Sequence, residues 1–390
     1  MSSEDAGLVS GLSLNTEPPA DQDTVPDVET VFRAQYQEAG SLCLGLEHCS
    51  VLGLTETGGG QVVGLTHTGR LTSYDPELLV STWDLGPGED RVRAVASHGT
   101  EPHLVLSCGE SLKVWDLREA GRPVLELRDS SKLGPLQFSC LAASRAGLVV
   151  AGTEQQGLDS FLLFWDLKAG GQELGGYWSV HSDDVTSLQF HSQSQHRLLT
   201  GSTDGLVNIL DLSKPEEEEA LLSSYNSLDS VAEARWRGQG EEVVVRTHTE
   251  ALQTWSPSTS RHQTFTRADL AGGIRRAVED HVYIVGLEVE EEEVEVVAGS
   301  RYIPSPCLRS LSLTDNGDLQ PQAHFIKAGP STRCCLRLKQ SNSFVTGGED
   351  GVIRIWRKVD GESAPASSQD STRKIATNDT SKTRKKPYAK

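Results

Sequence analysis

The sequence has 390 residues, of which 36% are hydrophobic and 23% are charged, and its formal net charge is −19. It contains no run of about 18 apolar residues, so we expect no membrane-spanning helix. Its acidic N-terminus does not have the pattern of a secretory signal. The seven cysteines are odd in number and form no CxxC motif, which predicts reduced thiols in a cytosolic or nuclear protein.

The two ends of the chain differ in charge. Residues 1–28 carry six acidic and no basic residues, and we expect an acidic disordered tail. Residues 358–390 hold eight Lys or Arg against four Asp or Glu, and we expect a basic disordered tail. This tail has a net charge of +4, which leaves −23 for the rest of the chain. Such an acidic body argues against nucleic-acid binding, except weakly through the tail.

Between the tails, residues 29–357 are predicted to form one all-β domain. Residues 181–212 and 332–357 each contain an apolar strand ending in Thr-Gly, an Asp-Gly turn and an alternating strand, which is typical of a β-hairpin. A large residue recurs at the same place in such units, with spacings of 41, 50, 45, 45, 56 and 45 residues. The positions are Tyr74, Trp115, Trp165, Leu210, Trp255, Leu311 and Trp356.

Trp-Asp occurs in phase with this period at 115–116 and 165–166. With HSDDVTSLQFH (181–191), GSTDGLVN (201–208), LLFWDL (162–167) and TGGEDG (346–351), these motifs resemble the WD-repeat family over roughly residues 30–357. The resemblance implies a single seven-bladed WD-repeat β-propeller. The expected blades are approximately 41–88, 89–130, 131–178, 179–224, 225–268, 269–325 and 326–357.

The last repeat ends near Arg357, after only three strands. Residues 30–37 have strand-like composition and precede the first full repeat. We therefore expect residues 30–37 to supply the missing outer strand and close the ring, so that removing Val31 to Gln37 destabilises the whole domain.

The resemblance also implies a buried network of His, Ser or Thr, Asp and Trp within a repeat, which rigidifies it when complete. The residues assigned to such networks are His181, Thr200 and Asp204; Thr346, Asp350 and Trp356; Asp159 and Trp165; and Trp115 and Trp255. No repeat is complete, because Leu210 replaces a Trp and Gly329 stands at a His position. We therefore expect apolar stacking to hold the ring together.

No cluster of catalytic residues stands out, and we predict a chain that is not an enzyme and binds no cofactor or metal. His181 to Asp184 reads HSDD, but the repeat already explains His181 structurally. Catalysis would require polar groups that converge at the centre of the ring.

The leading functional hypothesis is a scaffold that binds a protein or peptide on one face of the propeller. The candidate residues on that face are Ser182, Asp184, Thr203, Thr332 and Glu349. Two acidic runs, Glu216–Glu219 and the group Glu288, Glu290–Glu293 and Glu295, are expected between strands, either as solvated loops or as docking sites for basic proteins.

A first alternative rests on Trp115-Asp116-Leu117-Arg118. It resembles the WDxR box through which propellers dock onto the adaptor of cullin–RING ubiquitin ligases, which implies adaptor contact through Asp116 and Arg118. Lys168 ends a weaker copy of this box.

A second alternative is a nuclear or nucleolar assembly factor. Lys382, Arg384, Lys385 and Lys386 form a candidate import signal, a weak RNA-attracting patch or part of a solubilising tail. The expected location is therefore nuclear, cytoplasmic or both.

Overall fold

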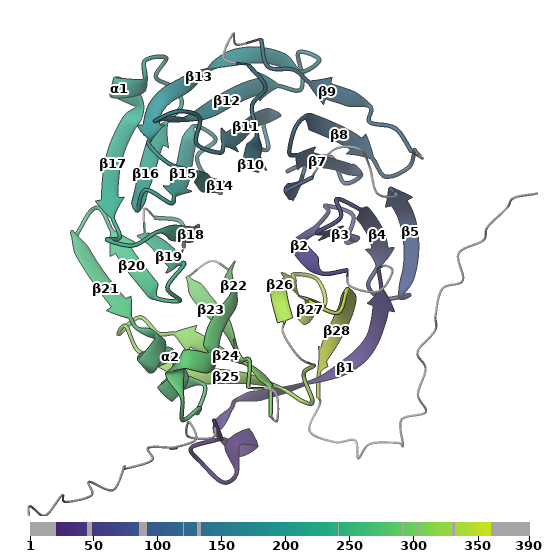
Figure 1. Ribbon diagram of the computed structural model, residues 1–390, viewed down its shortest axis with the longest axis vertical. Helices are drawn as coiled ribbons and strands as arrows, with labels where there is room; N and C mark the ends of the chain where they lie inside the picture. The colour runs from purple at the N-terminus through teal and green to yellow at the C-terminus, as the bar shows by residue number, and fades with distance from the viewer. Residues whose placement is uncertain are drawn as a thin grey trace, which may run out of the picture.

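The computed structural model describes residues 21–44, 49–85, 92–119, 121–130, 134–240, 242–290, 292–302, 305–329 and 332–359. These residues form a ring of antiparallel β-sheets with little helix (Figure 1). Five sheets have four strands each, and an eight-stranded sheet consists of two four-stranded halves joined through β1 (Ala34–Cys43). The chain is thus an all-β propeller, and its described strands group into seven four-stranded units.

Within each of the first six units the strands follow chain order from the centre of the ring outward, and in the last unit the three C-terminal strands do so inside β1 (Figure 1). The first two units are β2 (Val51–Glu56), β3 (Val62–Thr66), β4 (Leu71–Asp75) and β5 (Val80–Leu85), then β6 (Ala94–Ser97), β7 (Leu104–Cys108), β8 (Leu112–Asp116) and β9 (Leu125–Leu127). The next two are β10 (Phe138–Ala143), β11 (Leu148–Thr153), β12 (Ser160–Asp166) and β13 (Gln172–His181), then β14 (Val185–Phe190), β15 (Arg197–Ser202), β16 (Leu206–Asp211) and β17 (Leu221–Asn226). The last three are β18 (Val231–Arg237), β19 (Glu242–Thr247), β20 (Leu252–Ser256) and β21 (Arg261–Phe265); β22 (Val282–Glu290), β23 (Glu293–Ser300), β24 (Cys307–Leu313) and β25 (Leu319–Phe325); and β26 (Thr332–Leu338), β27 (Ser343–Gly348) and β28 (Val352–Lys358) with β1.

The recurring large residues found in the sequence lie in equivalent strands. Each of the seven, from Tyr74 to Trp356, belongs to the third strand of its unit. The longest spacing, between Trp255 and Leu311, contains helix α2 (Arg267–Gly273) and the 3-10 turn η2 (Glu279–His281). The third unit ends at His181, beyond the boundary expected at residue 178.

Apolar side chains fill the junctions between neighbouring units. Seven buried clusters among the described residues each combine side chains from two adjacent units. One cluster joins Val51 and Val62 of the first unit to Val345 and Ile353 of the last. Because a single four-stranded sheet cannot bury both of its faces, this stacking is the main stabilising contribution.

The N-terminal strand occupies the outer position of the last unit. β1 pairs antiparallel with β28 from Tyr36 to Cys43, and its first residues also pair in parallel with β25. The sequence analysis predicts this position for residues 30–37. The strand that occupies it, β1, spans residues 34–43 and so begins and ends later than predicted. Residues Val28–Val31 form a 3-10 turn, η1, instead of the expected strand. Residues 41–43, expected in the first blade, belong to β1.

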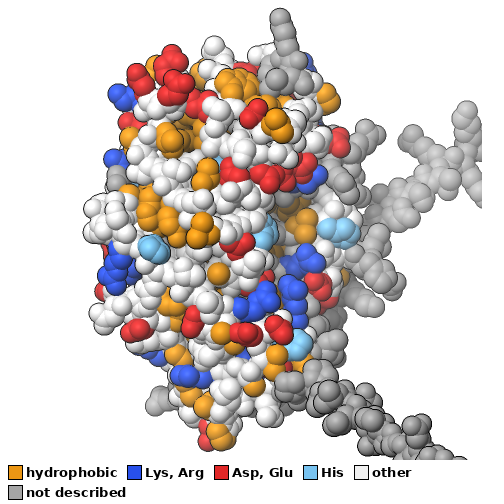
Figure 2. Space-filling model, turned by 60° about the vertical axis from the view of Figure 1, so that its left-hand side comes forward, with side chains coloured by type: hydrophobic (Ala, Val, Ile, Leu, Met, Phe, Trp, Pro, Cys, Tyr) orange, Lys and Arg blue, Asp and Glu red, His pale blue; other side chains and the backbone are white. Residues whose placement is uncertain are grey.

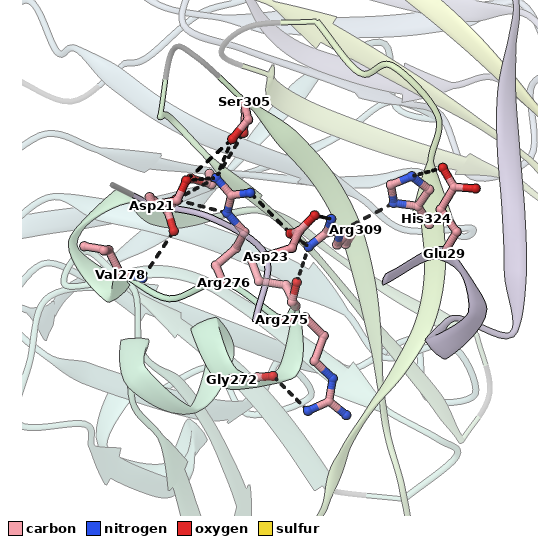
Figure 3. Close-up of polar contacts among 12 residues, drawn as sticks. Asp21, Asp23, Glu29, Gly272, Arg275, Arg276, Val278, Ser305, Arg309 and His324 are labelled. Atoms are coloured by element: carbon pink, nitrogen blue, oxygen red, sulfur yellow. Dashed lines mark hydrogen bonds and ion pairs between the residues drawn. The ribbon is translucent and has the colours of Figure 1, made fainter. Parts of the chain in front are cut away.

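The expectation of a disordered tail over residues 1–28 is wrong for residues 21–28, which pack on the sixth unit. The Asp21 side chain is fully buried and 2.9 Å from Nη2 of Arg276. The Asp23 carboxylate accepts hydrogen bonds from both terminal nitrogens of Arg309, at 2.7 and 3.0 Å (Figure 3). We call these four residues the N-terminal clamp. Residues 1–20 and 360–390 lie outside the described residues.

Both arginines of the clamp also donate hydrogen bonds to backbone oxygens of the sixth unit and its neighbouring loops. Arg276 also donates to the backbone oxygen of Ser305, and Arg309 donates to the backbone oxygen of Ile274. Burial by itself raises the pKa of Asp21, but hydrogen bonds from Ser300 and Arg276 outweigh it and hold the pKa below its usual value. Asp21 is therefore ionised near neutral pH, and the N-terminal segment is held by ion pairs between its carboxylates and buried arginines.

Truncating the aromatic residue of the closing strand tests its role. Tyr36 is buried, with its ring centroid 5.3 Å from that of Phe325 and 5.2 Å from that of Phe344. We expect Tyr36→Ala to lower the free energy of unfolding by about 3 kcal/mol, measured by denaturant titration followed by tryptophan fluorescence. Gln37→Ala, on an exposed neighbour in the same strand, should change it by less than about 0.5 kcal/mol. Equal effects of the two substitutions would contradict this role.

The clamp predicts an acid-sensitive contribution to stability. At neutral pH, Asp21→Asn should lower the free energy of unfolding by about 3 kcal/mol, because it removes the buried carboxylate that pairs with Arg276 at 2.9 Å and leaves that arginine only the more distant carboxylate of Asp23, at 3.3 Å. A lowered pKa stabilises the folded state at pH values above the unfolded pKa of about 4 and loses this effect as the pH falls through the folded pKa. The difference between wild type and Asp21→Asn should therefore begin to shrink below about pH 4 and vanish once the pH is below the folded pKa of Asp21, in the same titration.

The matched control is Glu29→Gln, because the Glu29 side chain is 58% exposed and 3.9 Å from His324. This substitution should leave the unfolding curve nearly unchanged. A difference between wild type and Asp21→Asn that is constant with pH would refute the ionic contribution.

Candidate functional site

The strand order divides the loops between two rims of the ring. Neighbouring strands run antiparallel, so the loops that lead into β14 and that join β15 to β16 lie on the same side. We call this side, with the equivalent loops of every unit, the upper rim. Ser182, Asp184, Thr203 and Glu349 lie on it. Asp116 and Arg118, at the end of a third strand, lie on the opposite side, the lower rim.

The upper-rim candidates differ in accessibility. Ser182 and Glu349 are exposed, and Asp184 and Thr203 are half-buried. Glu349 lies 2.9 Å from the guanidinium of Arg333. Thr332 is less accessible than a partner contact requires: it is only 8% exposed, because it pairs with Gly348 at the upper-rim ends of β26 and β27.

The structure brings the predicted network of the fourth unit together. His181 Nε2 lies 2.8 Å from the Thr200 hydroxyl, and His181 Nδ1 lies 3.1 Å from Asp204 Oδ2. The same Asp204 oxygen accepts the backbone N–H of Ser182 at 3.0 Å. The network therefore fixes the upper-rim loop that carries Ser182. Leu210, in the place of a Trp, is completely buried.

The seventh unit forms a different network. Trp356 Nε1 donates to the Thr346 hydroxyl at 2.8 Å, and Asp350 binds the guanidinium of Arg354. A Cβ added to Gly329 would lie 3.3 Å from Arg354 Cζ. The guanidinium of Arg354 thus lies beside the position where the family pattern has a His, and it supplies the partner of Asp350.

Among the remaining predicted network residues, only Trp115 bonds to a hydroxyl as the family network implies. Trp115 Nε1 donates to Ser107, a buried hydroxyl that the sequence analysis missed, and Trp165 Nε1 donates to the backbone oxygen of Arg128. Trp255 stacks on Tyr225 of the preceding unit, with ring centroids 5.2 Å apart. The assignment of Asp159 is wrong: it is exposed in a loop, and its backbone pairs with Gln156.

On the lower rim, Asp116 and Arg118 form a bidentate ion pair. Arg118 Nε donates to Asp116 Oδ1 at 2.9 Å, and Arg118 Nη2 donates to Oδ2 at 2.6 Å. Hydrogen bonding from Arg118 lowers the pKa of Asp116 to about 2. The Asp116 side chain is 10% exposed, whereas that of Arg118 is 67% exposed. The pair therefore presents an ordered guanidinium to solvent.

The two acidic runs are not simple loops. Glu217, in α1 (Glu217–Ala220), accepts the backbone N–H groups of Trp178 and Ser179, each at 2.7 Å, and so fixes the outer strand β13. The expectation that the second run lies between strands is wrong for Glu288 and Glu295, which pair directly across β22 and β23. Viewed from the side of β17, acidic side chains are spread over the surface with hydrophobic ones between them (Figure 2).

A polar group that the sequence analysis missed lies on three innermost strands. Glu233 and Arg235 of β18 are in contact at 2.7 Å, and Cys335 Sγ of β26 is 3.8 Å from Glu288 of β22. Burial raises the pKa of Glu288 to about 8, although Arg235 opposes this shift. Burial also raises the pKa of Cys335 well above its usual range. Near neutral pH the thiol is protonated, so it is not an activated nucleophile.

The described part of the chain contains neither a metal-binding group of side chains nor a membrane-spanning helix. No group of three or more His, Cys, Asp or Glu there is arranged to hold a metal ion. Within the same ranges, no helix is long and apolar enough to cross a membrane.

Comparison with known proteins agrees with this architecture. The family described as "WD domain, G-beta repeat" matches residues 172–211 and 322–357. An uncharacterized WD repeat-containing protein of Saccharomyces cerevisiae is 26% identical over 299 residues, covering 73% of this chain and 74% of the relative. The WD repeat-containing protein 89 homolog of Dictyostelium discoideum is 31% identical over 171 residues, 43% of this chain and 44% of that protein.

A third relative is the GATOR2 complex protein Wdr59 of Drosophila melanogaster, which is 28% identical over 169 residues, 41% of this chain and 16% of the relative. The matched repeats, these relatives and the ring of four-stranded sheets agree with one another. The chain carries WD repeats and is similar to proteins of the WD-repeat family.

Proposed function

We propose that this protein is a non-catalytic platform that binds other proteins through the rims of its propeller. The observation that carries the proposal is a hydrogen-bonded loop of the upper rim: the network of His181, Thr200 and Asp204 fixes the loop of Ser182 instead of leaving those groups for chemistry. A rigid surface loses little conformational entropy when it binds. One relative, Wdr59, is by its name a component of a complex.

A second candidate function is that of a substrate receptor in a cullin–RING ubiquitin ligase. The exposed guanidinium of Arg118, oriented by two hydrogen bonds to Asp116, favours it. Such pre-organisation is suited to docking onto an acidic or hydrogen-bonding surface. Lys168 does not offer an equivalent group, since the contact with Asp166 at 2.8 Å comes from its backbone N–H.

Residence in the nucleus, the cytoplasm or both is a further proposal. The candidate import residues Lys382, Arg384, Lys385 and Lys386 lie outside the described residues, and their role rests on the sequence alone.

Affinity purification from cells with mass spectrometry tests both functions. We expect the platform to recover a reproducible set of proteins, also after truncation following Val359. If the ligase proposal holds, the set includes the cullin adaptor, and Arg118→Ala removes it because the oriented guanidinium is lost. Arg128→Ala is the matched control, since the Arg128 side chain is 84% exposed and pairs with Glu126. Adaptor recovery that is equal in both variants, or absent from wild type, would refute the ligase proposal only.

A further inference from the structure

The two most exposed large hydrophobic side chains among the described residues share one rim. Leu228 is 90% exposed and Leu158 is 81% exposed. Leu158 lies between β11 and β12, and Leu228 lies between β17 and β18, so both are on the upper rim. Single exposed leucines are common on protein surfaces, but these two lie on one hydrogen-bonded structure.

A chain of hydrogen bonds links the loops that carry the two leucines. Gln155, beside the Leu158 turn, donates through its backbone to Asp184 Oδ1 and through its side chain to the Ser182 oxygen, each at 2.7 Å. The backbone N–H of Thr203 donates to the Asp184 oxygen at 3.0 Å.

The chain of bonds continues into the loop that carries Leu228. Ser227 donates to the Gly205 oxygen through its backbone at 2.9 Å and through its hydroxyl at 3.0 Å. The loops of three consecutive units therefore form one continuous surface. We call it the leucine rim; it comprises residues 154–159, 182–184, 203–205, 226–230 and 248–250.

Each leucine is held outward by its turn. Leu228 has a φ of 61°, a left-handed conformation that a leucine rarely adopts. Asn226 Oδ1 accepts the Leu228 N–H at 2.8 Å and stabilises this conformation. Leu158 follows Gly157, whose φ of 75° allows the tight turn closed by the pairing of Gln156 with Asp159. A glycine would suit the position of Leu228 better, so the fold does not by itself account for the leucine there.

The charge of this surface indicates what it can bind. The leucine rim contains seven acidic residues and no Lys or Arg. Its carboxylates are Glu154, Asp159, Asp183, Asp184, Asp204, Asp229 and Glu250. Arg93, from outside the rim, pairs with Glu154, and His181 binds Asp204. The remaining excess of negative charge next to two exposed leucines complements a segment that is both apolar and basic.

We propose that the leucine rim is a docking surface for a segment of another protein that carries apolar side chains flanked by Lys or Arg. This inference rests on the proposed platform function and assigns the binding face within it. Leu158 and Leu228 supply the apolar contacts, and the carboxylates between them select the basic flanks.

Selection of displayed peptides on the immobilised full-length chain tests the inference. We expect enriched peptides to combine apolar residues with Lys or Arg. A synthetic copy of an enriched peptide should bind the double variant Leu158→Asp, Leu228→Asp at least about tenfold more weakly than wild type in fluorescence anisotropy. The matched control is Leu78→Asp, Leu174→Asp, because these leucines are 71% and 57% exposed but lie outside the upper rim. This control should bind like wild type.

A second variant separates binding from folding. Leu228→Gly relieves the left-handed conformation, so its Tm should equal or exceed that of wild type while its peptide affinity falls. Peptides that are acidic, or that bind all variants equally, would overturn the assignment of this rim and leave the platform function intact. Failure to enrich any peptide on wild type would also overturn it, whereas the platform function is decided separately by the proteins purified from cells.

Discussion

Pairing between the two ends of the folded domain is the constraint on which this structure depends. No unit can bury both of its faces alone, so every junction around the ring must be filled, including the one between the last unit and the first. β1 completes the last unit by pairing with β28, and the clamp of Asp21 and Asp23 on Arg276 and Arg309 fixes the segment that precedes it.

Much of the fold could be predicted from the sequence because each unit carries its own local signal. A large residue near the end of each third strand, with Asp-Gly turns before Leu210 and Trp356, was enough to find the units. The clamp has no such signal. Asp21 and Arg276 are 255 positions apart, and acidic composition around Asp21 suggests disorder until its buried partners are known. The prediction of a loop at Glu288 and Glu295 failed for a similar reason. The run of glutamates suggests a solvated loop, although valines alternate with the glutamates in β22 and β23.

The candidate site could be predicted only in part, for the same reason. His181, Thr200 and Asp204 recur at fixed offsets within a repeat, so their contact follows from the sequence. The exposure of Leu158 and Leu228 follows from loop conformation, and leucine in a β-rich sequence usually indicates core. Thr332 shows the opposite error, since a polar residue beside a loop is buried where two strands begin to pair. Which side of a loop residue faces solvent depends on neighbours far away in the sequence.

The long-range closure has a consequence during protein synthesis. Cys43 and Val352, which pair in the finished sheet, are 309 positions apart. At translation rates of 5–20 residues per second, β1 is synthesised about 15–60 s before β28, the strand with which it pairs. During this time the strand has no partner to pair with, and its side chains Tyr36 and Leu42, which are buried in the folded structure, remain unburied. The nascent chain therefore exposes an unpaired, aggregation-prone strand until β28 has been translated.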